Sequence, residues 1–209
     1  MNTLSNHPVL NRSIEASSAS VWRASLGLVV VGFAIAGALY SAASVSVAQL
    51  IFPVQSNGSL IELDGQVIGS RLVGQNVKNL AYFQPRPSAG NYSVDGMSAS
   101  NLAISNPQLQ KQIRERALVF AQVNHVGLDQ VPDDMITTSG SGIDPDISPE
   151  AAQLQAKRVA QQRHLSEQDV HQLIQQHIQA PQFGLYGQPR VNVLELNLAL
   201  DQRAIKLVQ

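Results

Sequence analysis

The longest apolar stretch of the chain lies near its amino-terminus, where no charged side chain occurs between Arg23 and Glu62. Within it, Leu26 to Ile51 is almost wholly apolar. A rise of about 1.5 Å per residue makes this stretch long enough to cross a hydrocarbon core of about 30 Å. The pattern therefore predicts three parts: a tail over residues 1–23, a membrane-spanning helix over residues 24–52 and a soluble domain over residues 53–209.

A cleaved signal peptide is a second interpretation of this stretch, because Ser46-Val47-Ala48 has the small-residue pattern of a cleavage site before Gln49. The uncharged run is longer than the apolar region of about 7–15 residues in signal peptides, which favours a retained anchor. Arg12 and Arg23 precede the span, whereas the first basic residue after it is Arg71. The positive-inside rule thus predicts a cytoplasmic amino-terminus and an external domain.

Small residues recur inside the span at intervals of four, as at Gly32 and Ala36. Such a spacing lets a second helix approach closely within lipid. We expect Gly32 and Ala36 to contact a partner helix. The alternative is that glycine and alanine are simply common in spanning helices.

The soluble domain begins and ends with strand-like alternation. Residues 59–73 alternate on either side of Asp64-Gly65 and predict a hairpin with a tight turn. Alternate leucines from Leu194 to Leu200 predict a half-buried strand over residues 190–200. With helices between them, these strands predict an α+β fold, in which one membrane helix precedes a single mixed α/β soluble domain whose terminal strands share one sheet.

Capping patterns mark three helices between the predicted strands. Asn106-Pro107 and Ser148-Pro149 each combine a side-chain cap with proline at the first helical position. Ser166 with Asp169 resembles a capping box. Residues 82–98 and 131–147 are rich in proline, glycine and serine and are expected to be long loops.

Composition excludes several classes of function. Lysine and arginine total 14 and aspartate and glutamate total 15, and their interspersed charges predict no nucleic-acid-binding face. The chain has no cysteine, which rules out disulfides, zinc–thiolate sites and thiol catalysis. No H-E-x-x-H pattern occurs, and Asp144-Pro145-Asp146 does not continue as a calcium-binding loop, so we expect no metal site.

The segment Thr137–Asp144 is the best candidate for chemistry, since its glycines and small residues could form an anion-binding nest. It lacks the lysine of a phosphate loop, and a structural or partner-binding loop is the stronger interpretation. A serine nucleophile is conceivable at Ser139 or Ser141 with Asp144 and one histidine. The four histidines weighed for that role are His125, His164, His171 and His177. Arg86, Arg158 and Arg163 could bind a partner or form ordinary surface ion pairs.

Nine motifs occur in an order that closely resembles KdpC, the C subunit of bacterial high-affinity potassium-transporting P-type ATPases. The motifs are Gly69–Gln75, Tyr82–Ala89, Ser100–Leu102, Ser105–Pro107, Val131–Pro132, Thr138–Pro145, Ile147–Pro149, Arg158–Ala160 and Val191–Asp201. The resemblance covers nearly all of the chain from the span onward. It departs from the family pattern at Ile143, where leucine is commoner, and in a somewhat long segment before the span.

The resemblance implies a complex in the bacterial inner membrane in which KdpA carries the potassium filter, KdpB hydrolyses ATP and KdpF is a small helix. The C subunit is expected to assist assembly and to act as a catalytic chaperone that raises the ATP affinity of the ATPase subunit. Ser139, Gly140, Ser141 and Gly142, with Gln155, are similar to a segment compared with an ABC-type signature. No cofactor of its own is implied, and ATP would act through the complex.

Topology and this nucleotide suggestion conflict, because an external domain cannot touch cytoplasmic ATP. The chain also lacks the D-K-T-G motif of aspartyl-phosphate formation and cannot itself be the hydrolase of the complex. We therefore expect a non-catalytic accessory subunit with a structural role on the outer face, and a role there in potassium access. Partner contacts are expected at Gly32, Ala36, Arg86, Asp144, Arg158 and Arg163. The alternative function is an exported, membrane-anchored serine hydrolase that uses Ser141.

Overall fold

The computed structural model describes residues 18–208, with side chains as far as Arg203. The chain divides into two compact units, which meet in sequence between Asn57 and Gly58. The first unit consists of the long apolar helix and a short helical turn, and the second contains all strands of the described residues. Arg12, on which the predicted topology partly depends, lies outside the described residues.

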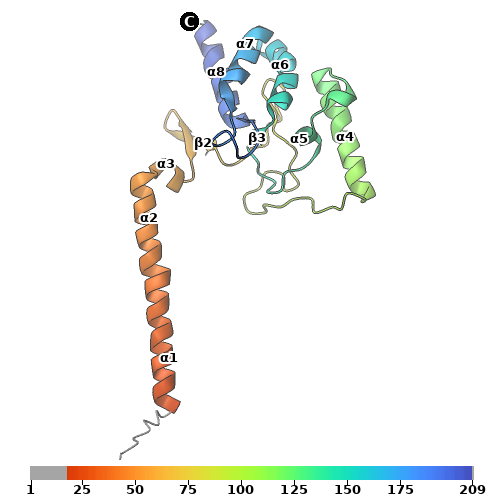
Figure 1. The fold of residues 1–209 in the computed structure, drawn as a ribbon. Helices are drawn as coiled ribbons and strands as arrows, with labels where there is room; N and C mark the ends of the chain where they lie inside the picture. The colour runs from red at the N-terminus through yellow and green to blue at the C-terminus, as the bar shows by residue number, and fades with distance from the viewer. Residues whose placement is uncertain (1–17, 209) are drawn as a thin grey trace, which may run out of the picture. The chain divides into compact units, whose positions relative to one another are not determined.

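The first unit is one continuous helix of 34 residues, Ser18–Ile51, followed by the short α3 (Pro53–Ser56). It comprises α1 (Ser18–Gly32), a π-helical segment η1 (Phe33–Leu39) and α2 (Tyr40–Ile51) (Figure 1). Almost all of its side chains are exposed within the chain. At about 1.5 Å per residue the helix is longer than the hydrocarbon core. Its uncovered apolar surface, length and composition fit a membrane span.

The second unit begins with the predicted hairpin, which the structure confirms. Strand β1 (Leu60–Leu63) pairs antiparallel with β2 (Gln66–Ser70). Asp64 and Gly65 both have positive φ, as a type I′ turn requires. The two strands form a sheet of their own.

The three predicted helix starts are also confirmed. Helix α4 (Pro107–Asn124) is capped by Asn106, α6 (Pro149–Arg163) by Ser148 and α7 (Glu167–His177) by Ser166. In each case the cap side chain accepts a hydrogen bond from a backbone N–H of the first turn. Helix α6 contacts both α4 and α7, and α7 contacts the last helix (Figure 1).

The predicted strand over residues 190–200 is wrong beyond its first three residues. Strand β5 (Arg190–Asn192) pairs with β3 (Asp146–Ile147) and β4 (Ile178–Gln179), and the chain then forms α8 (Val193–Val208). The Oδ1 atom of Asn192 accepts a hydrogen bond from Glu195 N at 3.1 Å and so caps this helix. Strands from the two ends of the domain do not share a sheet, because β1–β2 and β3-β5-β4 are separate.

The predicted loop over residues 131–147 also contains short regular elements. The 3-10 turn η2 (Leu128–Gln130) precedes it, and α5 (Asp133–Ile136) and β3 lie within it. By contrast, the predicted loop over residues 82–98 is confirmed, and the irregular segment is longer than predicted, because residues 71–105 contain neither helix nor strand and β2 ends at Ser70 instead of Val73.

Helices α6, α7 and α8 and the small sheet enclose the core of the second unit. Phe83, from the long irregular segment, is fully buried among them. On α8 the buried positions are spaced three and four apart, as expected for one face of a helix. The fully buried members of the core with the largest side chains are Phe83, Val159, Val170, Ile174, Val191, Leu196 and Leu200.

Candidate functional site

The candidate arginines, Asp144, Gln155 and the Ser139–Gly142 loop lie around one extended segment, Tyr82–Ser88, which crosses α6 and α8 without joining a sheet. The side-chain amide of Asn197 on α8 accepts from Phe83 N at 2.8 Å and donates to Phe83 O at 3.0 Å. Gln155 on α6 makes the same pair of hydrogen bonds with the next residue: it accepts from Gln84 N at 2.8 Å and donates to Gln84 O at 3.3 Å. Two carboxamides thus satisfy backbone groups that a neighbouring strand would otherwise pair.

Arg158, one turn along α6 from Gln155, extends this network. Its side chain is buried and donates four hydrogen bonds: to Asn124 Oδ1 at 2.9 Å, Gln155 Oε1 at 2.7 Å, Tyr82 O at 3.0 Å, and Leu80 O. Burial lowers the pKa of Arg158 to about 10. This value is still well above neutral pH, and the guanidinium therefore remains charged. Arg158 therefore holds the segment against α6 and α4 from inside the domain.

The loop Ser139–Gly142 holds the other end of the same segment. Ser139 N donates to Pro87 O at 3.3 Å, and Ser88 Oγ donates to Gly142 O at 2.6 Å. Gly142 has a φ of +75°, and a Cβ built on it would lie 2.7 Å from Ser98 O. A larger residue would therefore clash at this crossing of loops.

Two amide groups of this loop are bonded within the loop itself. Gly142 N donates to Ser139 Oγ at 2.8 Å, and Ile143 N donates to Ser141 Oγ at 3.2 Å. An anion nest needs successive amides that are free to turn toward a ligand. Three of the five amides from Ser139 to Ile143 are bonded, and the loop holds the Tyr82–Ser88 segment, while Gly140 and Ser141 remain exposed.

Two further predicted arginines also bind carboxylates beside this segment. Arg86 Nη1 lies 2.9 Å from Asp144 Oδ2. Arg163 binds Asp201, and its guanidinium lies 4.8 Å from the centre of the Tyr82 ring. The Tyr82 hydroxyl donates to the same Asp201 carboxylate at 3.1 Å. The contact between Tyr82 and Asp201 thus joins residues that are 119 positions apart in the chain.

The histidines do not form a triad with the serines. His125 and His164 are exposed caps with left-handed backbone at the ends of α4 and α6. His171 bonds Gln153 and Glu167, and His177 Nδ1 pairs with Leu173 O at 2.8 Å. Among residues 18–203, no hydrogen bond joins a histidine to Ser139 or Ser141. The geometry gives the serine hydrolase alternative no support.

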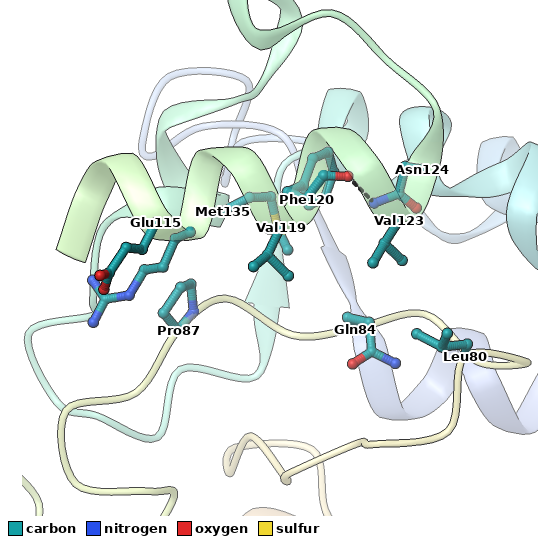
Figure 2. Close-up of a pocket in the computed structure, with 10 residues that line it drawn as sticks. Leu80, Gln84, Pro87, Glu115, Val119, Phe120, Val123, Asn124 and Met135 are labelled. Atoms are coloured by element: carbon teal, nitrogen blue, oxygen red, sulfur yellow. Dashed lines mark hydrogen bonds between the residues drawn. The ribbon is translucent and has the colours of Figure 1, made fainter. Parts of the chain in front are cut away.

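Two surface grooves flank the network. The first, of about 340 Å³, lies between α4 and the irregular segment, and Figure 2 shows Val119 and Val123 directed toward the stretch that carries Leu80, Gln84 and Pro87. The second, the acidic groove, has a volume of about 900 Å³. Its charged lining residues are Arg86, Asp133, Asp134, Asp144, Asp146, Glu150 and Arg190.

The acidic groove keeps an excess of negative charge. Arg86 pairs with Asp144, and Arg190 lies 3.0 Å from Asp146 Oδ2. Burial raises the pKa of Asp146, although Arg190 opposes this shift. No group of three or more histidine, cysteine, aspartate or glutamate side chains that could hold a metal ion occurs in the described part of the chain.

Sequence reasoning missed Asn197 and Asn124, whose amides complete the network. The signal for Asn197 lay in its surroundings, because a polar residue within the apolar run of residues 193–200 must find a partner if it is buried. Gly32 and Ala36 belong to the other unit, where Gly32 is the last residue of α1 and Ala36 lies within η1.

Comparison with known proteins accounts for most of the chain. The family model described as KdpC, the c chain of K+-transporting ATPase, matches residues 22–202. A potassium-transporting ATPase KdpC subunit of Xanthomonas oryzae is 44% identical over 193 residues, covering 92% of each chain. The corresponding subunit of Acidobacterium capsulatum is 52% identical over 74% of this chain and 83% of its own.

A third relative, the KdpC subunit of Pectobacterium atrosepticum, is 47% identical over 86% of this chain and 95% of its own. The match extends from the apolar helix into α8 and includes every residue of the hydrogen-bonded network around Tyr82–Ser88. On these grounds the chain belongs to the KdpC family of K+-transporting ATPase subunits.

Proposed function

We propose that this chain is a non-catalytic accessory subunit that assembles and stabilises an ATP-driven potassium-uptake pump. Membership of the KdpC family and the membrane-spanning helix support this role. Its partners are the KdpA, KdpB and KdpF subunits. The chain supplies no cofactor, and ATP hydrolysis resides in KdpB.

The observation that carries the proposal is that Ser139–Gly142 and Gln155 form hydrogen bonds within the domain. Both elements bind the backbone of the Tyr82–Ser88 segment. A nucleotide site would need these donors to face a ligand. We therefore assign the chain's effect on ATP affinity to its contacts with KdpB, as a catalytic chaperone that does not bind the nucleotide.

The partner contacts divide between the two units. Gly32 and Ala36 are proposed to pack against a helix of another subunit, because a Cβ built on Gly32 meets no atom within 4 Å beyond the adjoining residues of its own helix. Arg86 and Asp144 remain partly exposed at the acidic groove and are proposed contacts of the globular unit. Arg158 and Arg163 act indirectly, by fixing the segment that carries Arg86.

The globular unit is proposed to lie outside the cytoplasm, in the periplasm or at the cell surface. Arg23 precedes the uncharged run and Arg71 is the first basic residue after it, which is the asymmetry expected for a cytoplasmic amino-terminus. An external position also separates the globular unit from cytoplasmic ATP.

A cysteine-labelling experiment tests this proposal, since the chain has no cysteine of its own. Leu72→Cys places a thiol on an exposed position of the globular unit, and Ser18→Cys places one at the opposite end of the long helix. In spheroplasts, a membrane-impermeant maleimide is expected to label Leu72→Cys at once and Ser18→Cys only after permeabilisation. The reverse result would place the globular unit with ATP and overturn the proposed role.

Co-purification is the second test of the proposed assembly role. An affinity-tagged chain expressed with the other subunits is expected to bring KdpA and KdpB with it from detergent extracts. Recovery of the tagged chain alone would contradict an assembly role.

A further inference from the structure

The turn Gln182–Tyr186 presents three large apolar side chains to solvent. Phe183 is 91% exposed, Leu185 81% and Tyr186 68%. The stretch from Ile178 to Pro189 contains no charged residue. Exposed apolar side chains that lie together in this way are typical of an interaction site, whereas single ones are common on any surface.

The turn is held in one shape by its own backbone. Gln182 N donates to Tyr186 O at 2.9 Å, and Tyr186 N donates to Gln182 O at 3.0 Å. Leu185 N also donates to Gln182 O at 3.0 Å. Phe183 has a φ of +55°, a left-handed conformation that is unfavourable for a bulky side chain. Because the turn is preformed, binding through it costs little conformational entropy.

The acidic groove adjoins the turn. Gln188 and Pro189, two and three residues beyond Tyr186, line the groove. Within the described residues, no ion pair engages Asp133, Asp134 or Glu150. Asp134 accepts hydrogen bonds from Ser148 N and Oγ, so Asp133 and Glu150 are the carboxylates of the groove that a partner's cation can reach. An apolar tip next to a negative groove matches a partner that combines an apolar pocket with positive charge.

We propose that the turn Gln182–Tyr186 and the acidic groove form one docking surface for another subunit of the same transporter. The surface fits an extramembrane region in which an apolar pocket lies beside lysine or arginine side chains. Phe183 and Leu185 enter the pocket, and Asp133 and Glu150 face the cations. This inference rests on the proposed assembly role and names the surface through which the globular unit fulfils it.

Charge argues against a lipid surface as the occupant. Loops that bind anionic lipid combine apolar tips with lysine or arginine, which the negative surface potential attracts. Residues 178–189 have no basic side chain, and the neighbouring groove would be repelled by the same potential. A basic protein surface is the complementary occupant.

Thiol protection in the intact complex tests the docking surface. Phe183→Cys is expected to react with a soluble maleimide at least tenfold more slowly in the purified complex than in the lone chain. The lone chain is reconstituted in vesicles of phosphatidylethanolamine and phosphatidylglycerol, where we expect full reactivity. Ile104→Cys, on a side chain that is 84% exposed, is the matched control and should react equally in both samples.

Three outcomes would overturn the inference. The first is equal reactivity of Phe183→Cys in the two samples. The second is protection of Phe183→Cys in vesicles without partners, which would indicate lipid contact. The third is equal protection of Ile104→Cys in the complex, which would indicate general shielding. If the unsubstituted chain fails to co-purify with its partners, the proposed function itself is wrong. If the complex forms and Phe183→Cys stays reactive, only the docking surface is wrong.

Charge reversal tests the groove separately. Asp133→Lys combined with Glu150→Lys is expected to reduce co-purification at least fivefold at low salt, and the control Asp95→Lys, on an exposed loop, is expected to leave it unchanged. A deficit that disappears as salt is raised would be consistent with lost attraction between charges. No difference between these variants would rule out the electrostatic part of the surface.

Discussion

Gln155 and Asn197 show how single side chains can replace a strand. Each carboxamide bonds both backbone groups of one residue, Gln84 or Phe83, in a segment that has no strand beside it. A buried backbone group without a partner destabilises a fold by about 1–3 kcal/mol. These two amides therefore allow Phe83 to enter the core while the chain around it remains irregular.

The first prediction concerns Arg158, whose four hydrogen bonds join the irregular segment to α4 and α6. Arg158→Met should lower the free energy of unfolding by about 3 kcal/mol, because it leaves buried oxygen acceptors without donors. Chemical denaturation of the detergent-solubilised chain, followed by circular dichroism, measures this change.

Two further variants sharpen the test. Arg158→Lys should recover little stability, since one ammonium group cannot reproduce the fork of the guanidinium. Arg114→Met, on the exposed face of α4, is the control and should change stability by no more than about 0.5 kcal/mol. A loss at Arg158 no larger than that at Arg114 would show that the network is dispensable.

At the scale of the element, caps fix where the helices begin. Asn106, Ser148 and Ser166 bond the first turns of α4, α6 and α7, and all three starts were predicted from these residues. The start of α8 has an equivalent signal, Asn192 followed by Glu195, within a run that also alternates like a strand. The local sequence there fits both a capped helix and an alternating strand, and the helix forms because one of its faces packs against the core.

The second prediction uses the first turn of α7. Hydrogen bonds from Ser166 and Arg203 lower the pKa of Asp169. A carboxyl with a lower pKa in the folded than in the unfolded chain stabilises the fold above its unfolded pKa, and this contribution is lost as the pH falls through the folded pKa. The fold should therefore lose stability below about pH 4, near the ordinary pKa of aspartate.

Asp169→Asn removes this titration and should flatten the dependence of the unfolding temperature on pH between about pH 5 and pH 2. Asp95→Asn, in a loop without an ion pair among the described residues, serves as the control. Parallel pH profiles for the parent chain and Asp169→Asn would contradict the assigned role.

At the scale of the whole molecule, the chain consists of a single apolar helix and a globular unit, to which the proposed assembly role assigns different contacts. The helix exposes almost all of its side chains within the chain, and a Cβ at Gly32 meets open space. Its surface is therefore free for lipid or for other helices. The globular unit has its own core and needs no part of the helix to complete it.

The third prediction follows from that division. Gly32→Leu combined with Ala36→Leu should leave the chain folded but weaken its association with the partner subunits about tenfold, because bulky side chains prevent close helix packing. The control is Val31→Leu combined with Ile35→Leu, which has the same spacing but replaces side chains that are already large. Quantitative co-purification compares the two, and equal recovery of partners would show that the helix packs through another face.

The amino-acid sequence determined the features that arise from neighbouring residues. The uncharged run specifies the long helix, Asp64-Gly65 specifies the hairpin turn, and the capping residues specify the starts of three helices. In each case the interacting groups lie within a few positions of one another, or the property is carried by composition alone. Such interactions can be identified without knowing the path of the chain.

Tertiary structure alone decided which partners the loops bind and that residues 193–200 form a helix. Gln155 meets Gln84 across 71 positions and Asn197 meets Phe83 across 114, and nothing in the local sequence indicates those partners. The helical form of residues 193–200 likewise depends on which face of the run meets the core. The physical reason is that burial and the pairing of buried polar groups depend on segments far apart in sequence, which only the folded chain brings together.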